Sequence, residues 1–189
     1  MVCKMNLKCY FYTMKFCICA ILVCFTFGVF AQKNITALEV NESISLDASF
    51  NEPAWSKVQW ESNFTTLKPI PGKIPSKPTE VAILYDKEAI YFGVKCHDHE
   101  DSVSRVLSTR DDFNPNLDLI GIFLDTYNDK QNGFFFGITS VGVQIDSKIF
   151  NNDYNDLLNL VWNSKTVINQ DGWFAEIKIP YSAIRFPKK

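Results

Sequence analysis

The sequence after residue 31 predicts an all-β fold, an antiparallel β-sandwich of the jelly-roll kind. Short runs rich in Val, Ile, Phe and Tyr alternate there with clusters of Asp, Asn, Gly and Pro, which is typical of strands separated by turns. No long segment shows the apolar period of an α-helix. The 158 residues that remain when 31 are subtracted from 189 suit one domain with a sizeable core.

The first 31 residues differ in character from the rest of the chain. Three lysines precede an apolar run over residues 16–30, and Ala31 follows. A basic region before a short apolar core is typical of a secretory signal peptide. Because the run is shorter than the roughly 18 residues of a membrane-spanning helix, we expect cleavage between Ala31 and Gln32 rather than anchoring. The sequence therefore predicts an exported protein with a signal peptide at 1–31 and a β-sandwich domain at 32–189.

Charge and cysteine content limit the function of the mature part. Its 16 basic residues, 19 minus the three lysines of the signal peptide, stand against 21 acidic residues, a net charge of minus five. No basic stretch is present that could neutralise a run of phosphates, so we expect no nucleic-acid partner. Cys96 is the single cysteine after residue 31, which excludes an intrachain disulfide. Its place in the apolar phase of a strand favours a buried, unreactive thiol.

Two neighbouring runs give the clearest pair of strands. Residues 79–85 and 90–97 are joined by the turn Asp86-Lys87-Glu88-Ala89. Apolar residues occupy every even position from 90 to 96 in the second run, so they share one face. Such alternation marks a half-buried strand.

The remaining strands follow in order along the chain. Residues 119–125 are nearly all apolar, which predicts a strand covered on both faces. Strands are expected next at 133–139 and 141–149. A last pair is expected at 161–168 and 173–179.

The turn and the loops between these strands are also informative. Asp-Gly within residues 169–172 is a strong hairpin signal between the last two strands. In the final strand Trp173 points inward by phase, whereas Glu176 and Lys178 point out. Residues 68–78 contain four prolines and a glycine and are predicted to form an extended loop. Residues 151–160 are expected to hold one helical turn.

The order of these segments resembles the family 9 carbohydrate-binding modules. Residues 45–55, Ser-Leu-Asp-Ala-Ser-Phe-Asn-Glu-Pro-Ala-Trp, are similar to the opening of those modules, 81–94 to their paired strands and 118–125 to their central strand. Further similarity is to a branch found at the N-terminus of bacterial proteins that end in a predicted outer-membrane barrel of unknown function. The stretches that carry this second similarity are 110–112, 126–129, 133–136, 142–146 and 172–180. The resemblance implies a non-catalytic domain that binds an oligo- or polysaccharide, with Trp55 in the core.

Two departures from the family pattern limit what the resemblance implies. Sugar-binding members clamp the end of a glycan between two tryptophans, and the loop 112–117, where the first would lie, has none. The second tryptophan belongs to a C-terminal strand that would follow Lys189. We therefore expect the sandwich to lack its last strand or strands and to expose a sheet edge that invites pairing with another chain.

One loop combines the side chains that bind sugars, which stack their ring faces on aromatic groups and hydrogen-bond to planar polar groups. The predicted carbohydrate-binding residues are Arg110, Asp112, Phe113, Asn114 and Asn116 in this loop, and Trp162 after a second polar loop. The alternative is that Arg110 and Asp112 form a surface ion pair while Phe113 packs onto the sheet.

The acidic residues of the same region suggest a metal site. Asp111 and Asp118 offer hard oxygen ligands, and relatives bind calcium structurally, so we predict these two as ligands of a structural calcium ion. His97 and His99 share a strand face, but zinc needs three or four convergent ligands and the chain has no other histidine. We interpret the two histidines as a strand end that enters a solvated loop.

Three functions fit these observations. The first is carbohydrate binding, linked to glycan breakdown or uptake at the cell envelope. The second is a structural domain that docks on an outer-membrane barrel, which the missing clamp tryptophan favours. The third is a part of a glycoside hydrolase system, although no pattern singles out a catalytic pair of carboxylates and no Gly-x-Ser-x-Gly elbow is present. We predict a non-enzymatic protein that is periplasmic, associated with the outer membrane or secreted.

Overall fold

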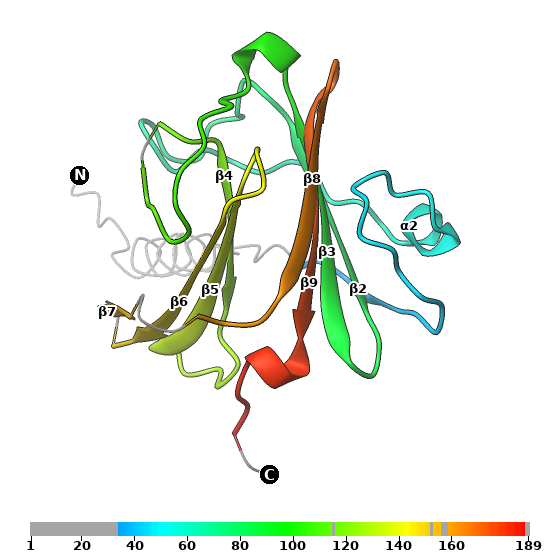
Figure 1. Cartoon of the computed structure of the whole chain (residues 1–189), viewed down its shortest axis with the longest axis vertical. Coiled ribbons are helices and arrows are strands. Elements are labelled where there is room, and N and C mark those ends of the chain that lie inside the picture. The colour runs from blue at the N-terminus through cyan, green and yellow to red at the C-terminus, as the bar shows by residue number, and fades with distance from the viewer. Residues whose placement is uncertain (1–33, 115, 152, 156–158, 188–189) are drawn as a thin grey trace, which may run out of the picture. The chain divides into compact units, whose positions relative to one another are not determined.

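The computed structural model describes residues 34–187 apart from 115, 152 and 156–158. One compact unit begins at Ile35. The predicted signal peptide, residues 1–31, lies outside the described residues. The described chain forms two β-sheets that pack face to face, so the predicted β-sandwich is confirmed (Figure 1).

The first sheet contains five strands and both predicted hairpins. In spatial order its strands are β1 (Leu38–Glu39), β2 (Thr79–Tyr85), β3 (Ala89–His97), β9 (Gly172–Pro180) and β8 (Asn163–Asn169). All neighbours are antiparallel except β1 and β2. The pairing of β3 with β9 runs from Ala89 opposite Pro180 to His97 opposite Gly172 and joins the two hairpins.

The second sheet contains four antiparallel strands. They are β4 (Leu119–Leu124), β5 (Asn132–Thr139), β6 (Gln144–Phe150) and β7 (Asp153–Asn155), in that order. Strand β6 begins later than predicted because Gly142, with φ of 87°, turns the chain and donates its N–H to the carbonyl of Thr139 at 2.9 Å. The expectation of a helical turn within 151–160 is wrong for residues 153–155, which form β7.

Strand β4 differs from the prediction that it is covered on both faces. Among the described strands it lies at the edge of its sheet, and the side chains of Leu119 and Phe123 on its outer face are 38% and 60% exposed. The strand covered on both faces is β5, in which residues 133–139 are all buried. An apolar run shows that both faces of a strand are hydrophobic, but it does not show which strand or loop lies beside it.

The main core lies between the sheets and is built from alternate residues of their strands. The buried side chains of β5 and β9 that meet there are Phe134, Phe136, Ile138, Trp173, Ala175, Ile177 and Ile179. The burial of Trp173, Ile177 and Ile179 confirms the inward-pointing positions predicted for β9. Burial of each large apolar side chain contributes about 1.5–3 kcal/mol relative to exposure.

A second core lies on the outer face of the five-stranded sheet, under the N-terminal segment. Leu84 and Tyr91 on β2 and β3 pack there against Trp55, which lies on helix α2 (Pro53–Lys57) and is 2% exposed. A Cβ atom on Gly93 would lie 2.8 Å from the Trp55 ring, so this close approach requires glycine at position 93. Trp55 is thus a core residue, as predicted.

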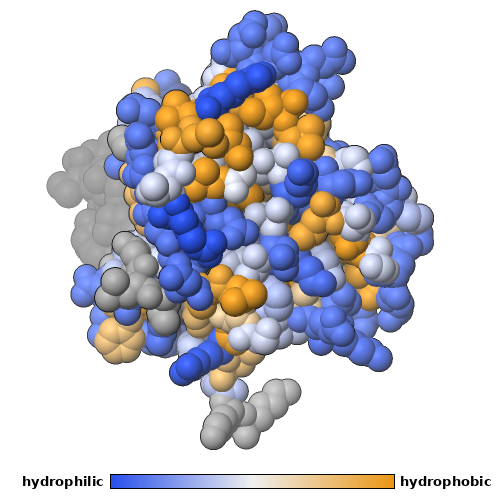
Figure 2. Space-filling model, viewed as in Figure 1, coloured by the Kyte–Doolittle hydropathy of each residue, from blue (hydrophilic) through white to orange (hydrophobic). Residues whose placement is uncertain are grey.

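Among the described residues, the helical elements besides α2 are the 3-10 turns η1 (Glu100–Ser102) and η2 (Tyr181–Ala183). Residues 68–78 form the loop predicted from their prolines. Within the described part of the chain, no helix has the length and apolar character needed to cross a membrane. On the face that Figure 2 presents, hydrophobic patches are separated by hydrophilic side chains.

Candidate functional site

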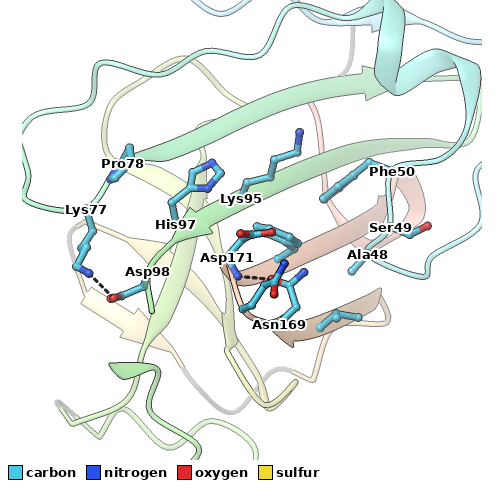
Figure 3. A pocket seen from close by; sticks show the side chains of 13 residues that line it. Ala48, Ser49, Phe50, Lys77, Pro78, Lys95, His97, Asp98, Asn169 and Asp171 are labelled. Carbon is cyan, nitrogen blue, oxygen red and sulfur yellow. Dashed lines mark hydrogen bonds and ion pairs between the residues drawn. The ribbon is translucent and has the colours of Figure 1, made fainter. Parts of the chain in front are cut away.

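A cleft of about 920 Å³ opens on the outer face of the five-stranded sheet, beside the second core (Figure 3). Its apolar lining comes from Ala48, Phe50, Pro78, Val167 and Phe174. Its polar lining comes from Ser49, Lys77, Lys95, His97, Asp98, Asn169, Gln170 and Asp171. Segments that lie far apart in the sequence therefore form one concave surface.

The floor of the cleft is a row of side chains from three adjacent strands. Phe174 on β9 lies opposite Lys95 of β3 on one side and Val167 of β8 on the other. Residues directly opposite each other in antiparallel strands project to the same face of a sheet. On β3 the side chains of Lys95 and His97 point away from the core, as the alternation in the sequence predicts. Both line the cleft.

One wall of the cleft is the N-terminal loop, which a buried carboxylate holds in place. The Glu176 side chain is fully buried, and its Oε2 accepts the backbone N–H groups of Asp47 at 2.8 Å and Ala48 at 2.6 Å. Burial raises the pKa of Glu176 above its ordinary value, although these two hydrogen bonds oppose the shift. Glu176 lies on the predicted face of β9, which points away from the core between the sheets. The N-terminal loop covers this face, so the side chain is buried and not exposed.

The aromatic side chains of the cleft belong to a larger cluster. The rings of Phe50 and Phe174 lie 6.4 Å apart, centre to centre, at an angle of 60°. Lys95 Nζ lies 3.8 Å from the centre of the Trp60 ring and 5.5 Å from that of Phe50. The ammonium group of Lys95 is therefore held against aromatic faces by cation–π attraction.

The rim of the cleft is polar and carries charges of both signs. Lys77 Nζ lies 2.6 Å from Asp98 Oδ1, and the hydrogen bond from Lys77 lowers the pKa of Asp98 (Figure 3). The backbone N–H of Asp98 donates to the carbonyl of Asp171 at 3.1 Å, so the β8–β9 turn is fixed to the end of β3. The Asn169 side chain accepts the N–H of Asp171 at 2.9 Å.

His97 lies on the wall of the cleft between Phe174 and Glu80. Its ring centre is 6.1 Å from that of Phe174. Its Nε2 atom lies 3.3 Å from Glu80 Oε1, but the two groups lack the geometry of a hydrogen bond. Nε2 is therefore a buried polar atom at the wall that has no hydrogen-bonding partner among the described residues.

This arrangement suits an uncharged ligand with many hydroxyl groups. Phe50 and Phe174 offer half-buried apolar rings, and amide and carboxylate groups stand at the rim. The ammonium groups of Lys77 and Lys95 face the carboxylates of Asp98 and Glu80 respectively, so no single charge dominates. Rings that stack and planar groups that accept or donate hydrogen bonds are what a sugar ring requires.

The predicted binding loop is largely used within the fold. Arg110 donates to Gln144 Oε1 at 2.7 Å and forms an ion pair with the fully buried Asp146. Asp146 Oδ1 also accepts the indole N–H of Trp162 at 3.1 Å. Arg110 is therefore paired with Asp146, and the alternative ion pair with Asp112 is not observed.

Trp162 is placed in the core and not on the surface. It is 4% exposed, and its ring packs edge-on against Phe136 at 5.5 Å between centres. The prediction that Trp162 binds a sugar does not agree with this burial. The sequence around Trp162 does not show whether its side chain points into the core or toward solvent.

Phe113, Asn114 and Asn116 lie in the loop that leads to β4. Phe113 is 47% exposed and lies 5.6 Å from the ring of Phe135, centre to centre. The Asn114 side chain accepts the N–H of Asn116 at 3.0 Å, and the carbonyl of Asn116 accepts the Ser104 hydroxyl at 3.1 Å. Among the predicted sugar-binding residues, Phe113 alone offers an exposed ring.

The two residues predicted to hold calcium form hydrogen bonds within the fold. Asp111 Oδ1 accepts the N–H of Asp146 at 2.8 Å, and its other oxygen lies 3.7 Å from Arg110 Nε. Asp118 Oδ2 accepts the N–H of Ser104 at 2.7 Å. In the described part of the chain, no three His, Cys, Asp or Glu side chains gather as a metal site. The carboxylates of Asp111 and Asp118 thus fix the loop.

The other reactive groups near the cleft have structural roles. Burial raises the pKa of the Cys96 thiol to about 11, so the thiol is protonated at neutral pH. His99 lies beside Asp101, with Nδ1 and Oδ2 3.5 Å apart, in an exposed turn. The two histidines thus have separate acidic neighbours, consistent with the interpretation of a strand end that enters a loop.

The cleft contains residues that sequence reasoning missed, among them Phe50, Phe174 and Asn169. Two features of the sequence could have indicated them. Side chains of β3 and β9 alternate toward the outer face of the sheet, and the hairpin turn beside them is rich in amide and acid groups. The missing information was that the N-terminal segment folds back over the same face.

Comparison with known proteins gives matches at the level of family and fold. A model of the family described as "Carbohydrate family 9 binding domain-like" matches residues 46–189. A carbohydrate binding module family 9 from Caldicellulosiruptor kristjanssonii in complex with cellotriose superposes with a TM-score of 0.52 at 19% identity, covering 78% of this chain and 67% of that one. A module of the same family and organism in complex with glucose gives a TM-score of 0.46 at 18% identity and covers 81% and 72%. No curated protein matches the chain.

The family match and the fold agree with each other. The matched residues include all the strands from β2 to β9 and span more than half of the chain. The module solved with cellotriose has the same sandwich fold. The chain belongs to the carbohydrate family 9 binding domain-like family, whose members are binding modules and not enzymes.

Proposed function

We propose that the chain binds a neutral oligo- or polysaccharide in the cleft between the N-terminal loop and the β8–β9 hairpin. The observation that carries the proposal is the position of Phe50 and Phe174 in one cleft with the polar groups of the β8–β9 turn. Membership of a carbohydrate-binding family supports it. The solved relatives bind cellotriose and glucose, so β-linked glucose oligomers are the first ligands to test.

Replacing Phe174 with alanine tests the cleft directly. Loss of a stacking ring removes about 1.5–3 kcal/mol of apolar burial, so we expect F174A to bind about ten- to a hundredfold more weakly than the wild type. Isothermal titration calorimetry of the full chain against glucose, cellotriose and a panel of other soluble oligosaccharides measures this change.

The matched control is F113A, because Phe113 is the exposed aromatic residue of the predicted loop. The proposal requires F113A to bind as the wild type does. Loss of binding in F113A with F174A unchanged would move the site to residues 110–116. No heat from any oligosaccharide at millimolar concentration would count against carbohydrate binding itself.

We also propose that the protein is exported and that residues 1–31 are removed. The support is the basic region followed by the apolar run over 16–30. We expect intact-mass measurement of the protein from an expressing cell to show a new N-terminus at Gln32. A protein that keeps residues 1–31 after passage through the secretion route would contradict cleavage. An exported binding domain of this family would capture glycans for breakdown or uptake at the cell envelope.

A further inference from the structure

Two carboxyl groups hold the same short stretch of the N-terminal loop. Glu176 Oε2 accepts the backbone N–H groups of Asp47 and Ala48, and Glu52 Oε1 accepts the backbone N–H of Ser45 at 2.9 Å. Glu176 comes from β9, whereas Glu52 is the residue that precedes helix α2. The two carboxyl groups therefore converge on one segment of four residues, although they lie far apart in the sequence.

The second oxygen atom of each carboxyl group is buried without a partner. Neither Glu176 Oε1 nor Glu52 Oε2 forms a hydrogen bond with a described residue. A buried acceptor that stays unpaired is unfavourable, and two neighbouring buried carboxylates also repel each other. Burial is the largest cause of the raised Glu176 pKa, and the charges of Glu52 and Asp47 raise it further. This pair of carboxyl groups is therefore unfavourable when both are ionised.

The lysines on this face of the sheet are directed elsewhere. Lys178 lies over the Tyr91 ring, with Nζ 5.4 Å from its centre, and Lys95 is held by the aromatic cluster of the cleft. Lys165, which lies opposite Glu176 on β8, is exposed. The charged and titratable groups around Glu176 on the elements packed against it are Tyr91 and Lys95 on β3, Lys165 on β8, Lys178 on β9, and Asp47, Glu52 and Lys57 on the N-terminal segment. Of these charges, that of Glu52 acts most strongly on Glu176.

We propose that Glu52 and Glu176 share one proton, and that this proton holds the N-terminal wall of the cleft in place. A proton on Glu176 Oε1 allows this atom to donate to Glu52 Oε2, so one hydrogen bond satisfies both of the buried oxygen atoms. Glu176 Oε2 carries no proton and continues to accept the two backbone N–H groups. The pair then carries one negative charge in place of two.

Loss of the shared proton to solvent as the pH rises opens the wall of the cleft. Two negative charges then face each other in a buried place, and their repulsion acts on the segment that both side chains hold. Phe50 lies two residues beyond Ala48 and lines the cleft, so movement of this segment withdraws its ring. The cleft therefore loses affinity for a sugar at high pH. This last step rests on the proposed function, whereas the shared proton does not.

Carbon-13 NMR of the carboxyl groups in the full chain tests the pair without any sugar. Spectra from about pH 5 to about pH 9 cover the range in which buried glutamates titrate. The carboxyl carbons of Glu52 and Glu176 should shift in one common transition, because the two groups share the proton. In E52Q the repulsion is gone and the glutamine amide can donate to Glu176 Oε1, so the Glu176 transition should move to lower pH. E42Q changes an exposed residue of the same segment and should leave the transition in place.

Calorimetric titration with cellotriose over the same pH range tests the control of the cleft. The dissociation constant of the wild type should rise with pH through the transition, by at most about tenfold per pH unit because one proton is involved. E52Q should bind equally well across the range. E176Q is a second variant that cannot titrate, and its amide can replace the protonated carboxyl group, so its affinity should also be constant. E42Q should follow the wild type.

Separate transitions of the two carboxyl carbons, or a Glu176 transition that E52Q leaves in place, would overturn the shared proton. A shift of the transition to lower pH on addition of calcium chloride would also overturn it, because a cation would then join the two carboxylates. A common transition with a constant dissociation constant would overturn the control of the cleft. Absence of sugar binding at every pH would contradict the proposed function, and the NMR titration would still decide the shared proton.

Discussion

Glu176 on β9 connects the five-stranded sheet to the N-terminal loop, which forms one wall of the cleft. Its Oε2 holds two backbone N–H groups of the N-terminal loop, while Oε1 is buried without a hydrogen-bonding partner among the described residues. In this loop Ala48 and Phe50 have φ of 61° and 56°, a left-handed conformation that is unfavourable for side chains other than glycine. The carboxylate therefore stabilises a strained loop that carries Phe50 into the cleft.

Replacing Glu176 with alanine should lower the free energy of unfolding. The buried N–H of Ala48 and the partly buried N–H of Asp47 would lose their acceptor, at a cost of about 1–3 kcal/mol. Urea denaturation measures the change, with E42A as a control at an exposed position of the same N-terminal segment. Equal stability of E176A and the wild type would mean that the loop is held by other contacts.

The pH dependence of stability gives a second measure of the same residue. The folded protein has a raised Glu176 pKa, so between the ordinary value of 4.5 and the raised value it binds a proton that the unfolded chain does not. The free energy of unfolding should therefore increase as pH falls through the raised pKa. E176Q cannot titrate, so it should lack this increase when urea denaturation is repeated across that range.

At the scale of elements, the β8–β9 hairpin depends on one glycine. Gly172 has φ of 129°, and a Cβ atom there would lie 2.1 Å from the carbonyl oxygen of Cys96 and 2.6 Å from the N–H of Asp98. The turn that supplies Asn169 and Asp171 to the cleft is packed directly on the end of β3. Cys96 lies opposite Trp173 of β9, and the Asp98 N–H donates to the carbonyl of Asp171, so neither backbone group can move without breaking a contact with the hairpin.

We expect G172A to destabilise the protein more than G72A does. Both glycines have positive φ, but a Cβ on Gly72 would meet nothing within 4 Å. G72A therefore isolates the left-handed backbone penalty of about 1–2 kcal/mol, and G172A adds the steric clash, typically about 1–3 kcal/mol more. Urea denaturation of both variants measures the difference, and equal losses would contradict the clash.

Individual strands and hairpins were predictable from the sequence, but the pairing of strands that are distant in the sequence was not. The β2–β3 and β8–β9 hairpins follow from alternation and turn residues, which act over a few positions. The position of β4 at an edge depends on which strands pair across the sheet, and the apolar run of 119–125 does not contain that information. The segment 153–155 forms a strand because β6 offers its edge there, although the local sequence favoured a turn.

For the whole molecule, two cores share the central strands. Phe92 faces the core between the sheets, and its neighbour Tyr91 faces the core beneath the N-terminal segment. The sequence could place each residue on a face, but it could not show that residues 44–58 cover the second face. For that reason the sequence directed attention to the loop 110–116, whereas the concave surface lies under the N-terminal loop.

The pairing of β3 with β9 also determines when the domain can fold. The wall of the cleft is fixed through a contact between residues 128 positions apart, and β9 lies between β3 and β8 in its sheet. Contacts between distant parts of a chain form slowly, because a long loop must close first. The sheet cannot be completed until the ribosome has synthesised β9. A nascent chain cannot close this sheet during most of its synthesis, and the export proposed above requires a chain that has not yet closed its sheets.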